Sequence, residues 1–335
     1  MLWPAKNLCG LIAVAFVSSC AREVRSHSRE SRASAEPMRE TVAHSIRTHP
    51  HGTIAATLRS SGRPFGIAVS RTGIVYCTLL DAASLIRATL QADSLTTVPV
   101  GRVPTDVAFS PAGTWAYVTN QWAQTVGIVD ARTTRQVHTI PVSGDPYRVA
   151  VGPEGQQVYV TTNTGDLVLI DPEMRRVART VRLGGNLNGL VISADGARVY
   201  VGDVSGTIYE LDAAGDVLRQ FAVPGRPQGL GLSADGRELY AAGEGGDYIV
   251  LNLETGAEVA RVALGAGGFG LAVTPDQTQV WVTAPAAGRV FVIGRASRTI
   301  RSTIDVGGTP RRLAFDQTGT LVAIADEAGT IRFVN

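Results

Sequence analysis

The feature of this sequence that most constrains its fold is a repeat of about 41 residues. In each repeat a short apolar run is followed by a tight turn, and the turns fall at Gly73, Gly113, Gly155, Gly196, Gly236, Gln277 and Gly319. Successive turns are 40 to 42 residues apart. This period, built from short strands and glycine turns, is typical of β-propellers, in which every repeat forms one blade of four strands. Seven repeats therefore predict seven blades.

Each apolar run is predicted to be the innermost strand of its blade. The runs, such as residues 107–109 and 190–192, lack the alternation of apolar and polar residues that marks a half-buried strand. Propeller blades stand radially, so both faces of an inner strand pack against neighbouring blades and are apolar. The next strand carries an aromatic residue in six of the seven repeats, at Tyr76, Tyr117, Tyr159, Tyr200, Tyr240 and Trp281. We expect these rings to pack between blades rather than to form a ligand platform.

The last repeat predicts how the ring closes. After Thr309 it contains only three strand-like segments, 313–315, 321–325 and 330–334, and the sequence ends at Asn335. A further strand-like segment, 53–58, precedes the first inner strand. Donating it to the last blade would pair both termini and leave no open sheet edge. The sequence therefore predicts an all-β, seven-bladed β-propeller over residues 52–335, with four antiparallel strands per blade and an N-terminal strand that completes the last one.

The first residues differ in composition from the repeats. Residues 8–17 are almost wholly apolar, and residues 17–20 read Val-Ser-Ser-Cys. An apolar run of about ten residues is too short to cross a bilayer but suits a signal peptide. Small residues before a cysteine, directly after such a run, resemble a bacterial lipobox, which implies that Cys20 is lipidated. We expect residues 1–19 to be a signal peptide; the alternative is an ordinary secretory signal cleaved nearby.

Residues 20–51 are predicted to be a lipidated cysteine followed by a flexible tether. The segment after Cys20 is rich in Ser and Arg and shows no apolar periodicity, so it cannot bury a core. A lipidated Cys20 makes the membrane a partner and places the protein in the bacterial cell envelope, on the periplasmic or extracellular face.

The charge balance and the scarcity of reactive residues exclude several functions. Residues 1–50 hold seven of the 31 basic and four of the 29 acidic side chains, so the remainder carries a net charge of −1 and is not expected to bind nucleic acid. Lys6 is the only lysine, and four of the five histidines lie in the first 51 residues. Because the sequence also lacks a G-x-S-x-G elbow, zinc-ligand spacing and a P-loop, we expect no catalytic residue, no metal and no cofactor, and favour a protein that is not an enzyme.

One short motif resembles a known family. Tyr117-Val118-Thr119-Asn120 spells the YVTN signature, and degenerate copies occupy residues 159–162 and 281–284. In these features residues 52–335 resemble the YVTN (YncE-like) family of seven-bladed propellers. The resemblance implies an extracytoplasmic location, in agreement with the N-terminus, but it implies no single function. Seven-bladed lactonases share the architecture, so a lactonase-type hydrolase that uses the axial channel is the alternative to a binding module.

The candidate ligand contacts are the two residues that open each inner strand, here called the opening pair. Connections between blades lie at one end of the axial channel, so the opening pairs surround that end. In four pairs the second residue is glycine, which we attribute to a tight backbone turn. The pairs that depart from small or neutral residues supply Asp106, Arg148, Arg311 and Arg312, and Asn188 and Gln228 complete the candidate set. Convergent arginines suit a carboxylate or phosphate ligand, whereas an Asp–Arg network that ties blades together is the alternative.

A loop at the same end adds Trp122 as a candidate contact, with packing over its own blade as the alternative. Among the opening residues only Asp106 and Asn188 suit a hard cation, which is too few for a metal-dependent lactonase. The sequence thus predicts an exported, membrane-anchored propeller that acts as a binding or scaffolding module for a protein or a small anionic ligand.

Overall fold

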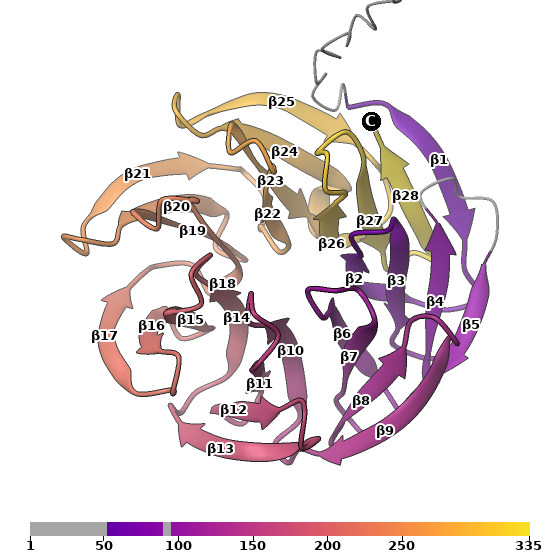
Figure 1. Ribbon diagram of the computed structural model, residues 1–335. Helices are drawn as coiled ribbons and strands as arrows, with labels where there is room; N and C mark the ends of the chain where they lie inside the picture. Colours follow the sequence, from indigo (N-terminus) through magenta and orange to yellow (C-terminus); the bar gives the residue numbers. More distant parts are fainter. Residues whose placement is uncertain (1–51, 90–94) are drawn as a thin grey trace, which may run out of the picture. The chain divides into compact units, whose positions relative to one another are not determined.

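The strands are arranged as seven four-stranded sheets around a central axis (Figure 1). The computed structural model describes residues 52–89 and 95–335, and neighbouring strands within each sheet are antiparallel. These observations confirm the predicted all-β, seven-bladed propeller. The predicted signal peptide (1–19), Cys20 and the tether to residue 51 lie outside the described residues, and their boundaries stay predictions.

The first three blades follow one another along the chain. Blade 1 comprises β2 (Pro64–Val69), β3 (Ile74–Leu79), β4 (Ser84–Thr89) and β5 (Thr96–Pro99). Blade 2 comprises β6 (Pro104–Phe109), β7 (Trp115–Asn120), β8 (Thr125–Asp130) and β9 (Arg135–Pro141). Blade 3 comprises β10 (Pro146–Val151), β11 (Val158–Thr162), β12 (Asp166–Asp171) and β13 (Arg176–Arg182).

The next three blades continue in the same order. Blade 4 comprises β14 (Leu187–Ile192), β15 (Arg198–Asp203), β16 (Thr207–Asp212) and β17 (Val217–Ala222). Blade 5 comprises β18 (Pro227–Leu232), β19 (Glu238–Gly243), β20 (Asp247–Asn252) and β21 (Glu258–Ala263). Blade 6 comprises β22 (Leu271–Val273), β23 (Gln279–Ala284), β24 (Arg289–Gly294) and β25 (Thr299–Asp305), with a 3₁₀ turn, η1 (Pro285–Ala287), between its second and third strands. None of the described segments is a helix of the length and apolar character needed to cross a membrane.

Blade 7 closes the ring as predicted. It comprises β26 (Pro310–Phe315), β27 (Val322–Asp326) and β28 (Thr330–Val334), and β1 (Ile54–Arg59) completes it by pairing antiparallel with β28. Figure 1 shows the indigo β1 beside the yellow β28. The backbone groups of Thr53 and Asn335 exchange two hydrogen bonds, of 3.2 and 3.0 Å, so the residue before β1 is joined to the residue after β28.

The aromatic rings of the second strands form the core between blades, as expected. All six are at most 4% exposed. Tyr117 of blade 2, for example, packs with Val149 and Val160 of blade 3 in one apolar cluster. Because each blade buries its faces against its neighbours, these contacts between blades hold the ring together.

The threonine of the YVTN signature links adjacent blades. Thr119 Oγ1 accepts a hydrogen bond from the Asp106 amide (3.0 Å) and donates one to the Tyr147 carbonyl of blade 3 (3.1 Å). Thr283 repeats this arrangement in blade 6, with the Gly270 amide at 2.7 Å and the Arg311 carbonyl of blade 7 at 2.6 Å. The hydroxyl therefore satisfies buried backbone groups of two inner strands at once.

A bulge positions the opening pairs. In β6 the pairing register shifts between Pro104 and Asp106, and β10 has the same shift between Pro146 and Arg148. A bulge breaks the strict alternation of side chains along a strand and re-aims them. Adjacent residues of one pair can therefore both lie towards the channel.

Glycine occupies four of the opening pairs for a different reason from the one predicted. None of the four has a positive φ, so no tight turn requires them. A Cβ on Gly66 would lie 2.6 Å from the Thr105 carbonyl oxygen, and one on Gly270 would overlap the Arg311 carbonyl oxygen. Glycine is required because neighbouring inner strands approach closely here.

Candidate functional site

A small cavity lies on the axis where inner strands of several blades meet. Its volume is about 100 Å³, and it is lined by Ile67, Asp106, Val107, Arg148, Val149, Gly270, Leu271, Arg312 and Leu313. The polar part of the lining is therefore three of the predicted site residues: Asp106, Arg148 and Arg312. The structure brings these three together from blades 2, 3 and 7.

Asp106 and Arg148 form a link between two blades. Arg148 Nη1 lies 3.2 Å from Asp106 Oδ2, and the same oxygen accepts a hydrogen bond of 3.2 Å from the Val149 amide. Asp106 is 3% exposed, so its charge is desolvated and needs these partners. This half of the site matches the Asp–Arg network that was the alternative to a ligand site.

Arg312 lies against three aromatic rings that sequence reasoning missed. Phe65, Tyr147 and Phe269 open the inner strands of blades 1, 3 and 6, and we call them the aromatic cluster. The ring centroid of Phe65 lies 6.2 Å from that of Tyr147 and 5.6 Å from that of Phe269. Arg312 Cζ lies 5.7, 5.6 and 5.2 Å from the Phe65, Tyr147 and Phe269 centroids, within the range of cation–π attraction. Each of the three is the first residue of its opening pair, and this shared position is the sequence signal from which the cluster could have been predicted.

No carboxylate neutralises Arg312 among the described residues. The side chain is 4% exposed, and neither Nε nor Nη2 has a hydrogen-bond partner there. Burial, reinforced by the positive charge of Arg148, lowers the pKa of Arg312 to about 10. Arg312 is therefore still a cation at pH 7. With Arg148 and Asp106, it leaves the cavity lining with a formal charge of +1.

Arg311 has a different environment from its neighbour Arg312. It forms an ion pair with Glu327, which also pairs with Arg63. Burial raises the pKa of Glu327, but the hydrogen bonds and charges of Arg311 and Arg63 outweigh it, so the pKa lies below its usual value. Arg311 Cζ also lies 4.9 Å from the Phe269 centroid. Arg311 thus contacts the aromatic cluster but does not line the cavity.

Asn188 and Gln228 lie outside the cavity lining. Asn188 Nδ2 donates to Gln228 Oε1 (3.0 Å), and Gln228 Nε2 donates to Glu244 Oε1 (3.2 Å). These amides link blades 4 and 5 and pass to a carboxylate in a loop of blade 5. Asn188 and Gln228 therefore form an uncharged connection between two neighbouring inner strands.

Trp122 lies in the loop between β7 and β8 and is 64% exposed. It lines a separate groove of about 360 Å³, together with Arg63, Leu80 and Arg102 among others. Arg102 Cζ lies 5.9 Å from its ring centroid. The structure therefore gives Trp122 an exposed surface but does not bring it to the axial cavity.

Metal-ligating side chains are dispersed in the described part of the chain. No group of three or more His, Cys, Asp or Glu residues in ranges 52–89 and 95–335 is close enough to hold a metal ion. The chemistry of the axial cavity is that of a small cationic site, because its lining holds two guanidinium groups and one carboxylate, and that carboxylate pairs with Arg148.

Comparison with known proteins supports the architecture. No family model and no curated protein matches the chain. A solved structure, Kuenenia stuttgartiensis Hydrazine Synthase, is similar over 83% of this chain and 97% of that chain, with a TM-score of 0.75 and 17% sequence identity. At this level of identity the likeness shows the propeller fold alone.

Proposed function

We propose that this protein is a binding module whose axial cavity holds one small anion. The observation that carries the proposal is the buried Arg312 guanidinium, which has unpartnered N–H groups beside a cavity with a formal charge of +1. Burying an uncompensated charge costs several kcal/mol, and an anion between Arg148 and Arg312 would remove that cost. Charge-assisted hydrogen bonds to a guanidinium group are also stronger than hydrogen bonds between neutral groups.

The cavity volume restricts the ligand. About 100 Å³ equals the liquid volume of roughly three water molecules, at about 30 Å³ each. This space suits a halide or an anion of three to five heavy atoms, such as formate, nitrate, acetate or phosphate. The hydrolase alternative has no comparable support, because the single carboxylate of the lining is already engaged by Arg148.

We further propose where the module works. The apolar run before Cys20 and the YVTN-like repeats support a protein of the YVTN (YncE-like) type that is exported and held at the bacterial cell envelope by a lipid on Cys20. The tether of residues 21–51 would then present the propeller, and any protein partner at its exposed loops, at a distance from the membrane.

Isothermal titration calorimetry tests the anion site. The full chain, in a buffer whose only anions are too large for the cavity, is titrated with sodium formate, nitrate, acetate and phosphate. We expect one-site binding of at least one of them. Arg312→Met should weaken it at least tenfold, since a charged hydrogen bond contributes about 1.5–3 kcal/mol.

Arg102→Met is the matched control, because Arg102 lies at the Trp122 groove and not at the cavity. It removes the same charge and should leave the affinity unchanged. No heat with any of the four anions, or equal losses in the two variants, would refute the proposed function.

A further inference from the structure

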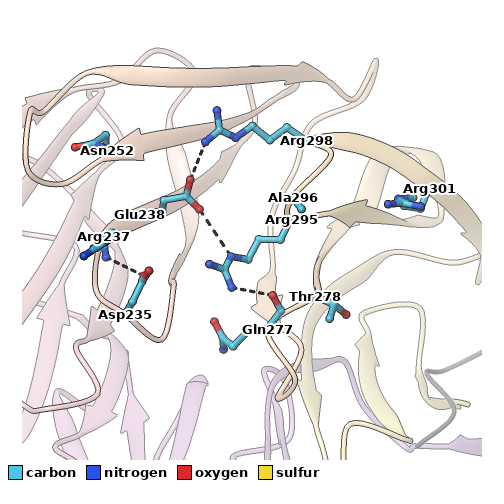
Figure 2. A pocket seen from close by; sticks show the side chains of 10 residues that line it. All are labelled: Asp235, Arg237, Glu238, Asn252, Gln277, Thr278, Arg295, Ala296, Arg298 and Arg301. Atoms are coloured by element: carbon cyan, nitrogen blue, oxygen red, sulfur yellow. Dashed lines mark hydrogen bonds and ion pairs between the residues drawn. The ribbon is translucent and has the colours of Figure 1, made fainter. Parts of the chain in front are cut away.

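The repeat produces two equivalent grooves at the end of the propeller opposite the opening pairs. One lies between blades 2 and 3, has a volume of about 580 Å³, and is lined by Ser110, Trp115, Tyr117, Gly155, Gln156, Gln157, Asp171, Pro172, Glu173 and Ala178. The other lies between blades 5 and 6, has a volume of about 610 Å³, and is lined by Asp235, Arg237, Glu238, Asn252, Gln277, Thr278, Arg295, Ala296, Arg298 and Arg301. We call the second one the arginine groove (Figure 2).

The two grooves share their backbone but differ in charge. Arg175 and Arg298 occupy the same left-handed turn position, with φ of 51° and 54°. Counted from these residues, Arg295 replaces Pro172 and Arg301 replaces Ala178. The lining of the arginine groove carries four arginines and two acids, whereas that of the other groove carries no arginine and two acids. The shared repeat therefore accounts for the groove and for Arg298, but not for Arg237, Arg295 and Arg301.

Part of this charge is neutralised inside the arginine groove. Figure 2 shows Glu238 between Arg295 and Arg298, with ion pairs of 3.7 and 2.8 Å. Glu238 also accepts a hydrogen bond of 2.7 Å from the Tyr240 hydroxyl. These contacts hold two arginines in place and leave the groove a formal charge of +2.

The other two arginines of the lining, Arg237 and Arg301, lie outside this ion-pair group. Both are exposed, and within the described residues neither forms an ion pair. In Figure 2 Arg237 projects from blade 5 and Arg301 from blade 6, on opposite sides of Glu238. The dashed line at Arg237 in Figure 2 is a hydrogen bond of 3.2 Å from its backbone amide to Asp235 Oδ1, and Arg301 Nε donates one of 3.3 Å to Ser297 Oγ. Two exposed guanidinium groups without a carboxylate ion pair thus flank a groove whose other lining residues include the neutral polar Asn252, Gln277 and Thr278.

We propose that the arginine groove docks an extended, acidic peptide segment of a partner protein. Arg237 and Arg301 would each pair with a carboxylate of the segment. The lining contains no apolar anchor and no aromatic ring, which argues against an amphipathic helix and against stacked bases of a nucleic acid. This surface is independent of the axial cavity, so it goes beyond the proposed anion site.

Fluorescence anisotropy with a labelled hexaglutamate peptide tests the proposal. Measurements on the full chain at about 0.15 M salt, where the Debye length is about 8 Å, suppress distant electrostatics. We expect saturable binding that the double variant Arg237→Gln, Arg301→Gln weakens at least tenfold. Because both side chains are exposed and outside ion pairs, the variant should keep the melting temperature of the wild type.

The matched control is Arg132→Gln with Arg135→Gln, which removes two exposed arginines from blade 2 at the same end. It should change the affinity less than twofold. The proposal is overturned if the peptide does not bind, if the control loses as much affinity as the groove variant, or if a labelled hexathymidylate binds as tightly as hexaglutamate. Since Arg312 is intact in both variants, failure here leaves the axial anion site untouched, and the reverse also holds.

Discussion

Replacing Arg312 with methionine measures whether the axial cavity carries an uncompensated charge. Methionine keeps a long apolar stem against the aromatic cluster and removes the guanidinium. Arg148→Met, by contrast, is expected to lower the free energy of unfolding, because that change leaves the Asp106 carboxylate buried without its ion-pair partner at 3.2 Å. Losing one partner of a buried pair costs about 3–5 kcal/mol.

The size of the Arg312 effect follows from its pKa. Burial lowers the pKa of Arg312 from 12.5 to about 10, and at about 1.4 kcal/mol per tenfold change the folded state disfavours the charged group by about 3 kcal/mol. At pH 7, below the pKa in both the folded and the unfolded chain, this cost is fully present, and it decreases only as the pH rises above about 10. Cation–π attraction, at about 2 kcal/mol for a desolvated cation and less than additive over three rings that share one guanidinium, offsets part or all of it. The net expectation is that Arg312→Met leaves the free energy of unfolding unchanged or raises it by up to about 2 kcal/mol.

Urea denaturation at pH 7, without small anions and again with a saturating one, provides the assay. An anion at about 100 times its Kd should stabilise the wild type by about 2.7 kcal/mol and should leave Arg312→Met unaffected. If Arg312→Met loses more than about 2 kcal/mol without anion, or gains as much from the anion as the wild type does, the guanidinium is already satisfied in the folded protein and the reasoning fails.

Three further predictions concern the fold and the anchor. Thr119→Val removes a buried hydroxyl that bonds two inner strands, so urea denaturation should show a loss of about 1–3 kcal/mol, against less than about 0.5 for the exposed Thr303→Val; equal values would contradict the blade-linking role. Deleting residues 53–59 removes β1 and should lower the melting temperature markedly, while deleting residues 21–50 should not, and equal melting temperatures would contradict closure by β1. Cys20→Ser should release the protein from membranes or leave it unprocessed in cell fractionation, and wild-type behaviour would exclude the lipid anchor.

The architecture was accessible from sequence because the repeat supplies its own reference. Once four strands per repeat are recognised, a last repeat with three strands demands a fourth, and residues 53–58 are the segment left over. The pairing of β1 with β28 confirms that count. The same register predicted that Asp106, Arg148 and Arg312 surround one end of the channel, and they line one cavity.

The environments of individual charges were not accessible in this way. Arg311 and Arg312 are adjacent, yet only Arg311 pairs with Glu327, which lies in the turn between β27 and β28. The turn itself recurs from blade to blade, but the residue at the position of Glu327 differs, being Asn163 in blade 3 and Val204 in blade 4, so the repeat gives no signal from which this contact can be deduced. The aromatic cluster joins blades 1, 3 and 6 across the channel, so its members are neighbours neither in sequence nor in blade order.

The central claim, an anion in the axial cavity, is tested most directly by a crystal structure of the protein soaked in sodium bromide. Bromide fits a cavity of about 100 Å³ and scatters anomalously. An anomalous peak within hydrogen-bond distance of Arg312 Nε or Nη2, absent from crystals of Arg312→Met, is the predicted result. A cavity that holds only water at saturating bromide, in a protein whose stability bromide does not change, would contradict the claim.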